Sequence, residues 1–256
     1  MSLQADQITA WLRRRLTASG ARGFVVGMSG GLDSSVVARL CQIAAPEQVV
    51  GLVMPCDSAE ADAVDALMVA RHFGIPATIV DLAPSYHRLV TDVSAGLNAP
   101  TVAAAAEAAA PALTRMALAN LKARLRMSTL YFTANALEHL VAGTSNRSEL
   151  LAGYFTKHGD GASDLLPVGG LLKGEVRALA RALEVPEAII DKPPGAGFWP
   201  GQTDEGEMGL TYADLDRYIT EGPETVSPAL AMRIERLMRA TGHKRTLPPV
   251  PGEADE

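Results

Sequence analysis

Short apolar runs without alternation recur along the first half of the chain. They cover residues 23–28, 48–54, 76–82 and 139–144, and a weaker run lies at 164–168. The first three are rich in β-branched residues, as expected for strands that are buried on both faces of a sheet. The pattern therefore predicts five strands.

Segments with helical periodicity separate these runs. They cover 34–45, 58–73 and 84–95, a shorter helix is expected at 5–18, and a long one from about 113 to 138. Strand, helix and strand at this spacing are typical of βαβ units. The sequence thus predicts an α/β fold with a doubly wound, parallel, five-stranded sheet that is flanked by helices.

The remaining segments predict the domain organisation. The stretches at 155–165 and 192–210 are rich in Gly, Pro and Asp, and loops of this length are usually either functional lids or disordered segments. The alanine-rich stretch at 103–110 suits either a helix or a mobile segment. We expect a single domain over residues 1–246 and a frayed tail at 247–256.

The amino-acid composition excludes several classes of protein. A hydrophobic content of 48%, a charged content of 20% and a net charge of −6 are typical of a folded protein and argue against one that coats nucleic acid. Cys41 and Cys56 are too far apart for a CxxC motif and make no disulfide framework. The start has no leader-like pattern, and no apolar run reaches membrane-spanning length. We expect a cytoplasmic protein with neither a nucleic acid nor a membrane as partner.

The most informative stretch, VVGMSGGLDSSVV, lies at 25–37. It has neither the lysine of a Walker A loop nor the spacing of a dinucleotide fingerprint. Glycines let the backbone approach a ligand, and the start of the next helix adds free N–H groups, so the loop suits pyrophosphate. Asp33 inside an anion site suits a Mg²⁺ ligand. The alternative is a Gly-rich turn in which Asp33 or Ser34 caps the helix.

The full SGGxDSS pattern resembles the PP-loop of the ATP pyrophosphatases. NLKARLRM at 120–127, the stretch 142–180 with AGTSNRSELLAGYFTK, and IIDKPPGAGFWPGQTDEGEMG from 189 extend the likeness. Together they resemble the ammonia-dependent NAD synthetases over roughly residues 20–220. That resemblance implies a Rossmann-like fold of the adenine nucleotide α-hydrolase type and a homodimer. It also implies adenylation of the nicotinate carboxylate of deamido-NAD by Mg-ATP, after which ammonia displaces AMP.

The resemblance carries over residue by residue. The expected ATP contacts are Gly27, Met28, Ser29, Gly30, Gly31, Leu32, Asp33, Ser34, Thr144, Lys173 and Gly195. Asp33 and Glu149 would bind Mg²⁺, and Asp33 and Lys173 would serve catalysis by stabilising charge in the adenylation step. The expected deamido-NAD contacts, which include cations suited to a pyrophosphate, are Arg124, Lys157, Asp164, His243 and Lys244.

Several of these residues have a plainer interpretation. Residues 144–149 also fit the start of a helix with a capping residue and an acidic first turn. Arg124 fits a solvated helix face, and His243 to Arg245 fit a helix C-terminus. Gly195 departs from the family, which has Ser or Thr at this position; one lost neutral hydrogen bond costs about 1 kcal/mol.

The nitrogen source and the reaction class have alternatives as well. Only a short predicted helix precedes the loop, and neither cysteine lies in a glutaminase setting, so ammonia is the expected substrate unless a separate glutaminase associates. Asp164 or a water is a candidate to deprotonate it. A PP-loop enzyme that modifies tRNA should carry Cys motifs or a basic domain, which are absent here. A nucleotide-binding protein without chemistry is favoured only by Gly195.

Overall fold

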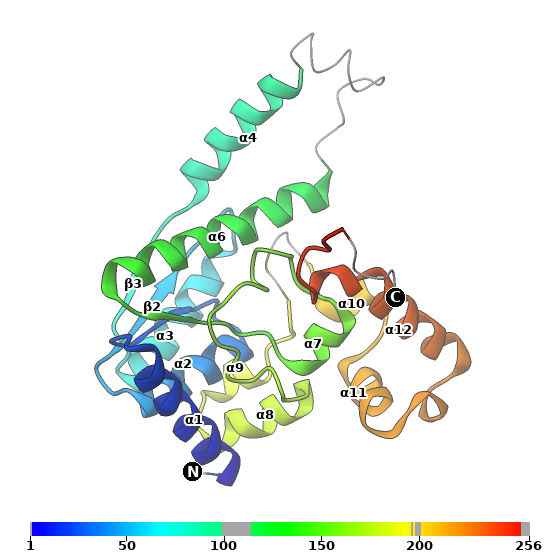
Figure 1. Cartoon of the computed structure of the whole chain (residues 1–256), viewed down its shortest axis with the longest axis horizontal. Helices are drawn as coiled ribbons and strands as arrows, with labels where there is room; N and C mark the ends of the chain where they lie inside the picture. Colours follow the sequence, from blue (N-terminus) through cyan, green and yellow to red (C-terminus); the bar gives the residue numbers. More distant parts are fainter. Residues whose placement is uncertain (1, 99–113, 196, 198–200, 252–256) are drawn as a thin grey trace.

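The computed structural model describes residues 2–98, 114–195, 197 and 201–251. Helices and strands alternate along the first half of the chain, and helices alone follow β4 (Figure 1). In sequence order the elements are α1 (Leu3–Ser19), β1 (Phe24–Gly27), α2 (Leu32–Ala44), β2 (Val49–Val53), α3 (Glu60–Phe73), β3 (Ala77–Ile79), α4 (Ala83–Leu97), α6 (Arg115–Leu137), β4 (Leu140–Ala142), α7 (Arg147–Ala152), α8 (Lys173–Ala182), α9 (Glu187–Ile190), α10 (Asp204–Met208), α11 (Tyr212–Glu221), η1 (Pro223–Thr225), α12 (Pro228–Ala240) and η2 (Gly242–Lys244).

Some of the predicted segments lie wholly or partly outside the residues that the structure describes. The alanine-rich stretch at 103–110 lies outside the described residues, and so do residues 252–256 of the expected tail. Residues 247–251 of that tail form no helix or strand. Within the described part of the chain, every helix is too short or too polar to cross a lipid bilayer.

The sheet is parallel and has the strand order β3-β2-β1-β4. The predicted α/β class is confirmed, but the prediction of a fifth strand was wrong, because the sheet of the described residues has four strands. Residues 164–168 make a single bridge, from Leu165 to Ala142 of β4. Pro167 follows closely and has no N–H to continue a ladder, so the pairing stops there.

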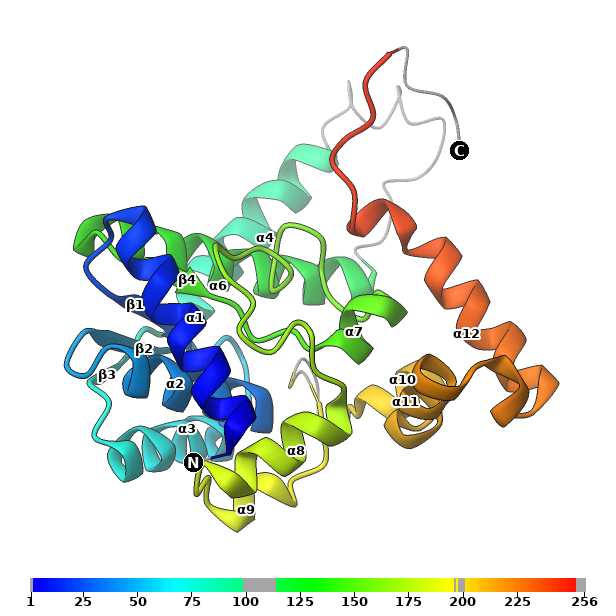
Figure 2. The same ribbon diagram turned by 60° about the horizontal axis from the view of Figure 1, so that its bottom comes forward.

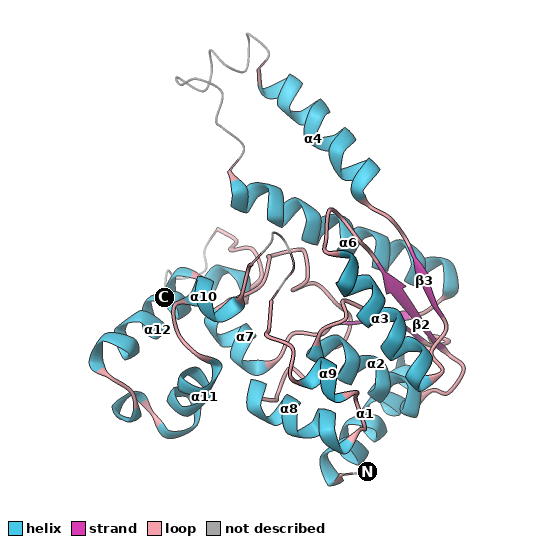
Figure 3. Ribbon diagram, turned by 180° about the vertical axis from the view of Figure 1, so that it is seen from behind, coloured by secondary structure: helices cyan, strands magenta, loops and turns pink. Residues whose placement is uncertain are grey.

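Helices cover both faces of the sheet (Figure 3). Phe24 and Val26 of β1 are fully buried in the core cluster that includes residues of α1, α2, α3 and α8. Val25, between them, is buried in the second cluster, which includes residues of α4 and α6. Successive side chains of a strand point to opposite faces, so the non-alternating apolar runs are explained by burial on both sides.

A third apolar cluster lies beside these layers, among the helices of the C-terminal half (Figure 2). Its buried members include Ala152 of α7, Met208 of α10, Leu215 of α11 and Ile234 of α12. This cluster fixes α7 and α11 relative to each other, which becomes important for the site.

The topology places a crevice at the carboxyl ends of β1 and β4. The chain leaves β1 through α2 on one face of the sheet, whereas it reaches β4 through α6 on the other face. Ligands of doubly wound sheets bind where the winding reverses in this way. The loops 28–31 and 143–146, which follow the two strands, therefore flank the expected binding position.

Candidate active site

A cavity of about 290 Å³ lies at this crevice. It is lined by most of the residues that were predicted to contact ATP or Mg²⁺, namely Gly27, Met28, Ser29, Gly31, Leu32, Asp33, Ser34, Thr144, Glu149, Lys173 and Gly195. These residues come from four separate segments of the chain, around 27–34, 144–149, 173 and 195, so the fold brings together residues that are far apart in the sequence.

The PP-loop connects β1 to α2 by a tight turn. Gly31 is the N-cap residue of α2 and offers no side chain, so neither Asp33 nor Ser34 caps the helix. The hydroxyls of Ser29 and Ser34 lie 3.0 Å apart, and Ser34 Oγ donates to the Gly31 carbonyl at 3.1 Å. These bonds hold the turn in a shape whose helix start can receive an anion.

Gly30 is required at its position in this turn. Its φ is +74°, and an added Cβ would lie 2.4 Å from the backbone oxygen of Asp62 on α3. A side chain would thus meet both backbone strain and a steric clash. Gly30 does not line the cavity, but it lets α3 approach the loop that does.

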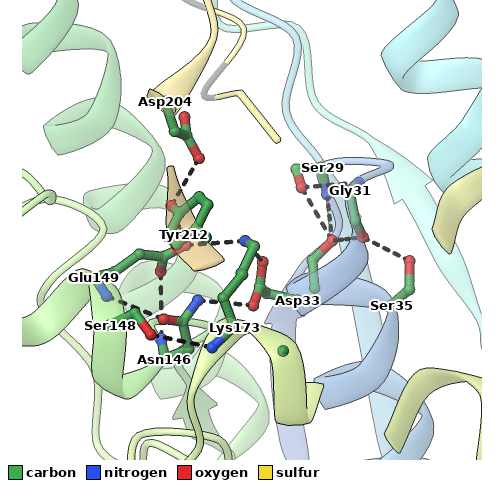
Figure 4. A network of polar contacts seen from close by, with 12 residues as sticks. Ser29, Gly31, Asp33, Ser35, Asn146, Ser148, Glu149, Lys173, Asp204 and Tyr212 are labelled. Atoms are coloured by element: carbon green, nitrogen blue, oxygen red, sulfur yellow. Dashed lines mark hydrogen bonds and ion pairs between the residues drawn. The ribbon is translucent and has the colours of Figure 1, made fainter. Parts of the chain in front are cut away.

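Lys173, the first residue of α8, lies between two carboxylates (Figure 4). Its Nζ is 2.5 Å from Asp33 Oδ2 and 3.2 Å from Glu149 Oε1, and its side chain is 5% exposed. Burial lowers the pKa of this ammonium, but the charges of Asp33 and Glu149 outweigh burial and hold the pKa above its ordinary value. Lys173 therefore stays protonated at neutral pH.

Glu149 contacts Lys173 and also forms part of a helix cap. Its backbone N–H donates to Asn146 Oδ1 at 3.0 Å, and its Oε2 accepts from the Asn146 N–H at 3.3 Å, which is a capping box at the start of α7. Burial raises the pKa of the Glu149 carboxyl, and the Lys173 charge opposes that rise. The interpretation of residues 144–149 as a helix start is correct, and the same geometry directs Glu149 toward the cavity.

Asn146 also joins the loop after β4 to the first turn of α2. It is fully buried, and its Nδ2 donates to Asp33 Oδ1 at 3.0 Å. Each carboxylate oxygen of Asp33 thus has a separate partner, Asn146 or Lys173. The sequence signal for Asn146 indicated a cap only, because its contact with Asp33 spans two distant segments.

The position of Lys173 depends on α11. Asp216 accepts a 2.5 Å hydrogen bond from Ser148 Oγ on α7 and a 2.8 Å bond from the Gly174 N–H. Ser148 Oγ in turn accepts from the Lys173 N–H at 3.1 Å. The start of α8 is therefore tied to α7 and α11 by partners that the sequence did not single out.

Tyr212 and Asp204 extend the polar network away from the loop. The Tyr212 hydroxyl lies 3.0 Å from Asp204 Oδ2 and 3.3 Å from Glu149 Oε1. Burial raises the pKa of both the Asp204 carboxyl and the Tyr212 phenol. Asp204 lines the cavity, so the aperiodic stretch 192–210 contributes to the site through α10.

The beginning of that stretch is anchored to α3. Lys192 Nζ lies 2.8 Å from Asp62 Oδ1 and 2.6 Å from Asp65 Oδ2. Gly195, the position that departs from the family, lines the cavity, and an added Cβ there would lie 2.9 Å from the Gln202 carbonyl. The departure thus coincides with a close approach of the chain to itself.

The residues predicted to hold deamido-NAD do not line this cavity. Four of them meet beside it: Arg124 Nη2 donates to the Lys157 carbonyl at 3.2 Å, and Lys157 Nζ donates to the His243 carbonyl at 2.6 Å. Lys244 Nζ donates to the carbonyls of residues 153 and 155. Arg245 donates to the Met238 carbonyl near the end of α12, so the interpretation as a helix C-terminus also has structural support.

Asp164 lies apart from those four residues. Its Oδ2 accepts from the Val141 N–H at 2.8 Å, and its Oδ1 accepts from the Tyr131 hydroxyl at 3.3 Å. Burial, together with the Asp164 charge, raises the pKa of Tyr131 to about 12. The carboxylate therefore supports β4, and a contact with the substrate is an additional role that stays a prediction.

The two cysteines belong to the core. Cys41 and Cys56 are fully buried in the two clusters that flank the sheet, and neither lines the cavity. Among the described residues, no group of three or more His, Cys, Asp and Glu side chains is arranged to hold a metal ion. Asp33 and Glu149 are the two carboxylates at the cavity that share the Lys173 ammonium.

Comparison with known proteins identifies the family. The model of the NAD synthase family matches residues 4–248. An NH(3)-dependent NAD(+) synthetase of Carboxydothermus hydrogenoformans is 45% identical over 97% of this chain and 96% of its own length. One from Methanocaldococcus jannaschii is 41% identical over 96% of this chain and 95% of its own.

Solved structures agree with this assignment. The NMN synthetase from Francisella tularensis has a TM-score of 0.87 and 34% identity, with 97% of both chains covered. The NH3-dependent NAD synthetase from Campylobacter jejuni has a TM-score of 0.77 and 29% identity, with 96% of both chains covered. The match of a family model to almost the whole chain, together with relatives of similar length, shows that this chain belongs to the NAD synthase family.

Proposed function

We propose that this chain is an ammonia-dependent NAD synthetase, a ligase that converts deamido-NAD, ATP and ammonia to NAD, AMP and pyrophosphate. The observation that carries the proposal is the position of Lys173, whose ammonium is held by Asp33 and Glu149 beside a PP-loop. Residues 1–246 would form one catalytic domain, and the reaction would take place in the cytoplasm.

The oxygen donors at the site suit Mg²⁺. Asp33 and Glu149 both contact one cation, Lys173 Nζ, and paired carboxylates are ligands that Mg²⁺ accepts. When bound, Mg²⁺ would neutralise phosphate charge and favour departure of pyrophosphate. Asn146 would hold Asp33 in position through its 3.0 Å hydrogen bond.

In the first step, an oxygen of the nicotinate carboxylate attacks the α-phosphorus of ATP, and the bond from that phosphorus to the bridging oxygen breaks. Pyrophosphate leaves with the electron pair. The carboxylate needs no general base at neutral pH. The chain would contribute the N–H groups at the start of α2 and the Lys173 ammonium, which stabilise negative charge on the phosphates.

In the second step, the nitrogen of ammonia attacks the carboxyl carbon of the adenylate. The bond from that carbon to the AMP oxygen breaks, AMP leaves, and the nitrogen loses one proton to give the amide. Asp164 or a water was the predicted proton acceptor. Because Asp164 is held by Val141 and Tyr131, we favour a water.

Deamido-NAD would extend from the cavity toward the predicted group of Arg124, Lys157, His243 and Lys244. Arg124, Lys157 and His243 already form a chain of hydrogen bonds in which backbone carbonyls accept from the two cations. A phosphate that replaced those carbonyls would gain charge-assisted bonds, which are stronger than bonds to a neutral acceptor.

We further propose a homodimer whose interface includes exposed apolar side chains of α4 and α6. Phe132 on α6 is 77% exposed, and Met116 on the same helix is 54% exposed. Leu89 and Val93 of α4 are also exposed, and α4 extends away from the body of the molecule (Figure 1). A dimer interface would remove these side chains from water, which is favourable for large apolar groups.

The assay that tests the function combines purified protein, Mg-ATP, deamido-NAD and ammonium chloride, and follows NAD, AMP and pyrophosphate. One NAD per AMP is expected. Asp33→Asn should lose this activity, whereas Asp6→Asn on α1 should keep it. Pyrophosphate release without NAD would indicate another acceptor, and absence of all products would indicate a binding protein; either outcome would overturn the proposal.

A second candidate function is amidation of the mononucleotide, and one observation favours it. The NMN synthetase from Francisella tularensis matches the fold more closely than the NAD synthetase from Campylobacter jejuni does. The chemistry at the carboxylate would be the same. The measurement is the ratio of kcat/KM values for deamido-NAD and for nicotinate mononucleotide, and the larger value identifies the substrate.

A further inference from the structure

Arg177 lines the same cavity as the PP-loop. It lies on α8 four residues after Lys173, and residues at this spacing share one face of a helix. The two cations are therefore directed to the same side of α8, although only Lys173 was predicted from the sequence. Arg177 is half-buried, and its Nε is shut off from solvent.

The lysines of the cavity have acidic partners, whereas Arg177 has none among the described residues. Lys173 is paired with two carboxylates, and Lys192 is paired with Asp62 and Asp65. Within the part of the chain that the structure describes, no side chain or backbone group accepts a hydrogen bond from Arg177 Nε. Each lysine charge is thus already neutralised, whereas the charge of Arg177 is not.

Arg39 provides a comparison inside the same structure. Its Nε is also buried without an acceptor among the described residues. However, Arg39 stacks on Phe73 at 4.7 Å, donates to Gln42 Oε1 at 2.6 Å and does not line the cavity. The surroundings of Arg39 account for its guanidinium. Arg126, the other arginine of the cavity, donates to the Met54 carbonyl and to Ser58 Oγ, so the guanidinium left without an explanation is that of Arg177.

A buried hydrogen-bond donor without an acceptor lowers the free energy of unfolding, and the loss is larger when the group is charged. A guanidinium offers several donors in a planar fork that matches the oxygens of a phosphate. An anion with several oxygens in the cavity would therefore satisfy Arg177. In the proposed reaction that anion is the β,γ end of ATP, which later leaves as pyrophosphate.

We infer that Arg177 binds the terminal phosphates of ATP and the pyrophosphate product, and that it supplies positive charge that no carboxylate cancels. The assignment to ATP rests on the proposed function, whereas the binding of pyrophosphate is testable without it. Arg177 would bind the leaving group, and its loss should weaken ATP and pyrophosphate binding while the KM for deamido-NAD stays unchanged.

The test is calorimetric binding of magnesium pyrophosphate and of Mg-ATP, without deamido-NAD, to the full chain. Arg177→Met removes the charge and retains the bulk of the stem, and Arg177→Lys retains the charge without the fork. Arg181→Met is the matched control, because Arg181 is one turn further along α8, is 53% exposed and is paired with Glu187. Circular dichroism confirms that each variant is folded.

We expect Arg177→Met to weaken pyrophosphate binding by about 10-fold or more, the effect of one lost charge-assisted contact. Arg177→Lys should lie between wild type and Arg177→Met, and Arg181→Met should match wild type. If Arg177→Met does not fold, the pyrophosphate affinity of Arg177→Lys decides the test, and it should be weaker than that of wild type. Wild-type affinity in both Arg177 variants would overturn the inference.

The outcomes also separate this inference from the proposed function. If wild type forms NAD but the Arg177 variants bind pyrophosphate as wild type does, only the inference fails. If wild type forms no NAD yet binds pyrophosphate through Arg177, the proposed function fails and the inference stands. A wild-type chain that binds neither pyrophosphate nor ATP would overturn both.

Discussion

At the scale of single residues, the ammonium of Lys173 neutralises two carboxylates that belong to different elements. Asp33 lies in the first turn of α2 and Glu149 in the first turn of α7, and both side chains are only 15% exposed. Removal of the lysine would leave two like charges close together in a mostly buried site. Such a site would bind another cation in its place.

We therefore expect Lys173→Met to have two effects. The rate of adenylation should fall by about 100-fold or more, because a charge that stabilises the transition state is lost. The melting temperature should fall without Mg²⁺ and rise with added Mg²⁺ more steeply than in wild type. Pyrophosphate release measures the rate, and thermal unfolding at several Mg²⁺ concentrations measures the melting temperature.

Lys122→Met is the control for this variant. Lys122 is also a buried lysine, but it pairs at 3.7 Å with one half-exposed carboxylate, Asp57, and does not line the cavity. Its loss should leave the response to Mg²⁺ as in wild type. An equal response to Mg²⁺ in both variants would contradict the cation-sharing role of Lys173.

Asp204 gives the molecule a pH-dependent stability. Burial raises the pKa of this carboxyl above its unfolded value of about 4, so the folded state favours the protonated form. Stability contributed by Asp204 is therefore present below the unfolded pKa and is lost as the pH rises through the folded pKa. Each unit of this shift corresponds to about 1.4 kcal/mol.

Asp204→Asn should remove that dependence, because the amide oxygen still accepts from Tyr212 and does not ionise. We expect the variant to gain stability relative to wild type between pH 4 and neutral pH. Urea unfolding of both proteins across this range measures the difference. A constant difference at every pH would show that Asp204 ionises in the folded state as it does in the unfolded chain.

Part of the site was predictable at this scale because its residues follow local patterns. The PP-loop and the helix start at Asn146 have spacings that express backbone geometry, and the family resemblance added Lys173. Tyr212, Asp204 and Arg177 were not predicted, because their importance comes from contacts between segments far apart in sequence. A tyrosine or an arginine on a helix has no local signal that distinguishes a site residue from a surface residue.

At the scale of elements, the tight turn of the PP-loop depends on Gly30. We expect Gly30→Ala to abolish pyrophosphate binding, because its Cβ would meet the Asp62 carbonyl. Gly20→Ala is a matched control: Gly20 has a nearly equal φ of +70°, and nothing lies within 4 Å of an added Cβ. Both variants should lose about 1 kcal/mol from the left-handed backbone alone.

Only Gly30→Ala should lose more stability than this and also lose binding. Unfolding and pyrophosphate titration of the two variants measure the contrast. Equal stability and equal binding in the two variants would mean that α3 moves freely away from the loop.

The helices and strands themselves were predicted well where burial sets the pattern. The runs at 23–28 and 48–54 contain β1 and β2, and the helix expected at 84–95 is α4. The prediction failed at 164–168, where the apolar run is interrupted by Pro167 and the chain makes one bridge instead of a strand. Hydrophobicity indicates burial, but a strand also needs N–H groups that continue the ladder.

At the scale of the whole molecule, the exposed apolar side chains of α4 and α6 predict the assembly state. We expect wild type to be a dimer and Phe132→Glu to be a monomer, because a carboxylate would be buried at the interface. Met232→Glu on α12, where the side chain is 64% exposed, should remain a dimer. Light scattering after size-exclusion chromatography measures the masses; a wild-type monomer, or a dimeric Phe132→Glu, would contradict the assembly.

The strand order has a consequence for how the chain is made. β1 lies between β2, which follows it closely, and β4, whose first residue Leu140 pairs with Phe24. A ribosome that synthesises from the N-terminus releases β2 and β3 well before β4, so one edge of β1 has no partner in the nascent chain. Unpaired edges recruit strands from other molecules. β1, an interior strand of the finished sheet, is thus an edge strand of the unfinished one, and premature termination before β4 should produce aggregates.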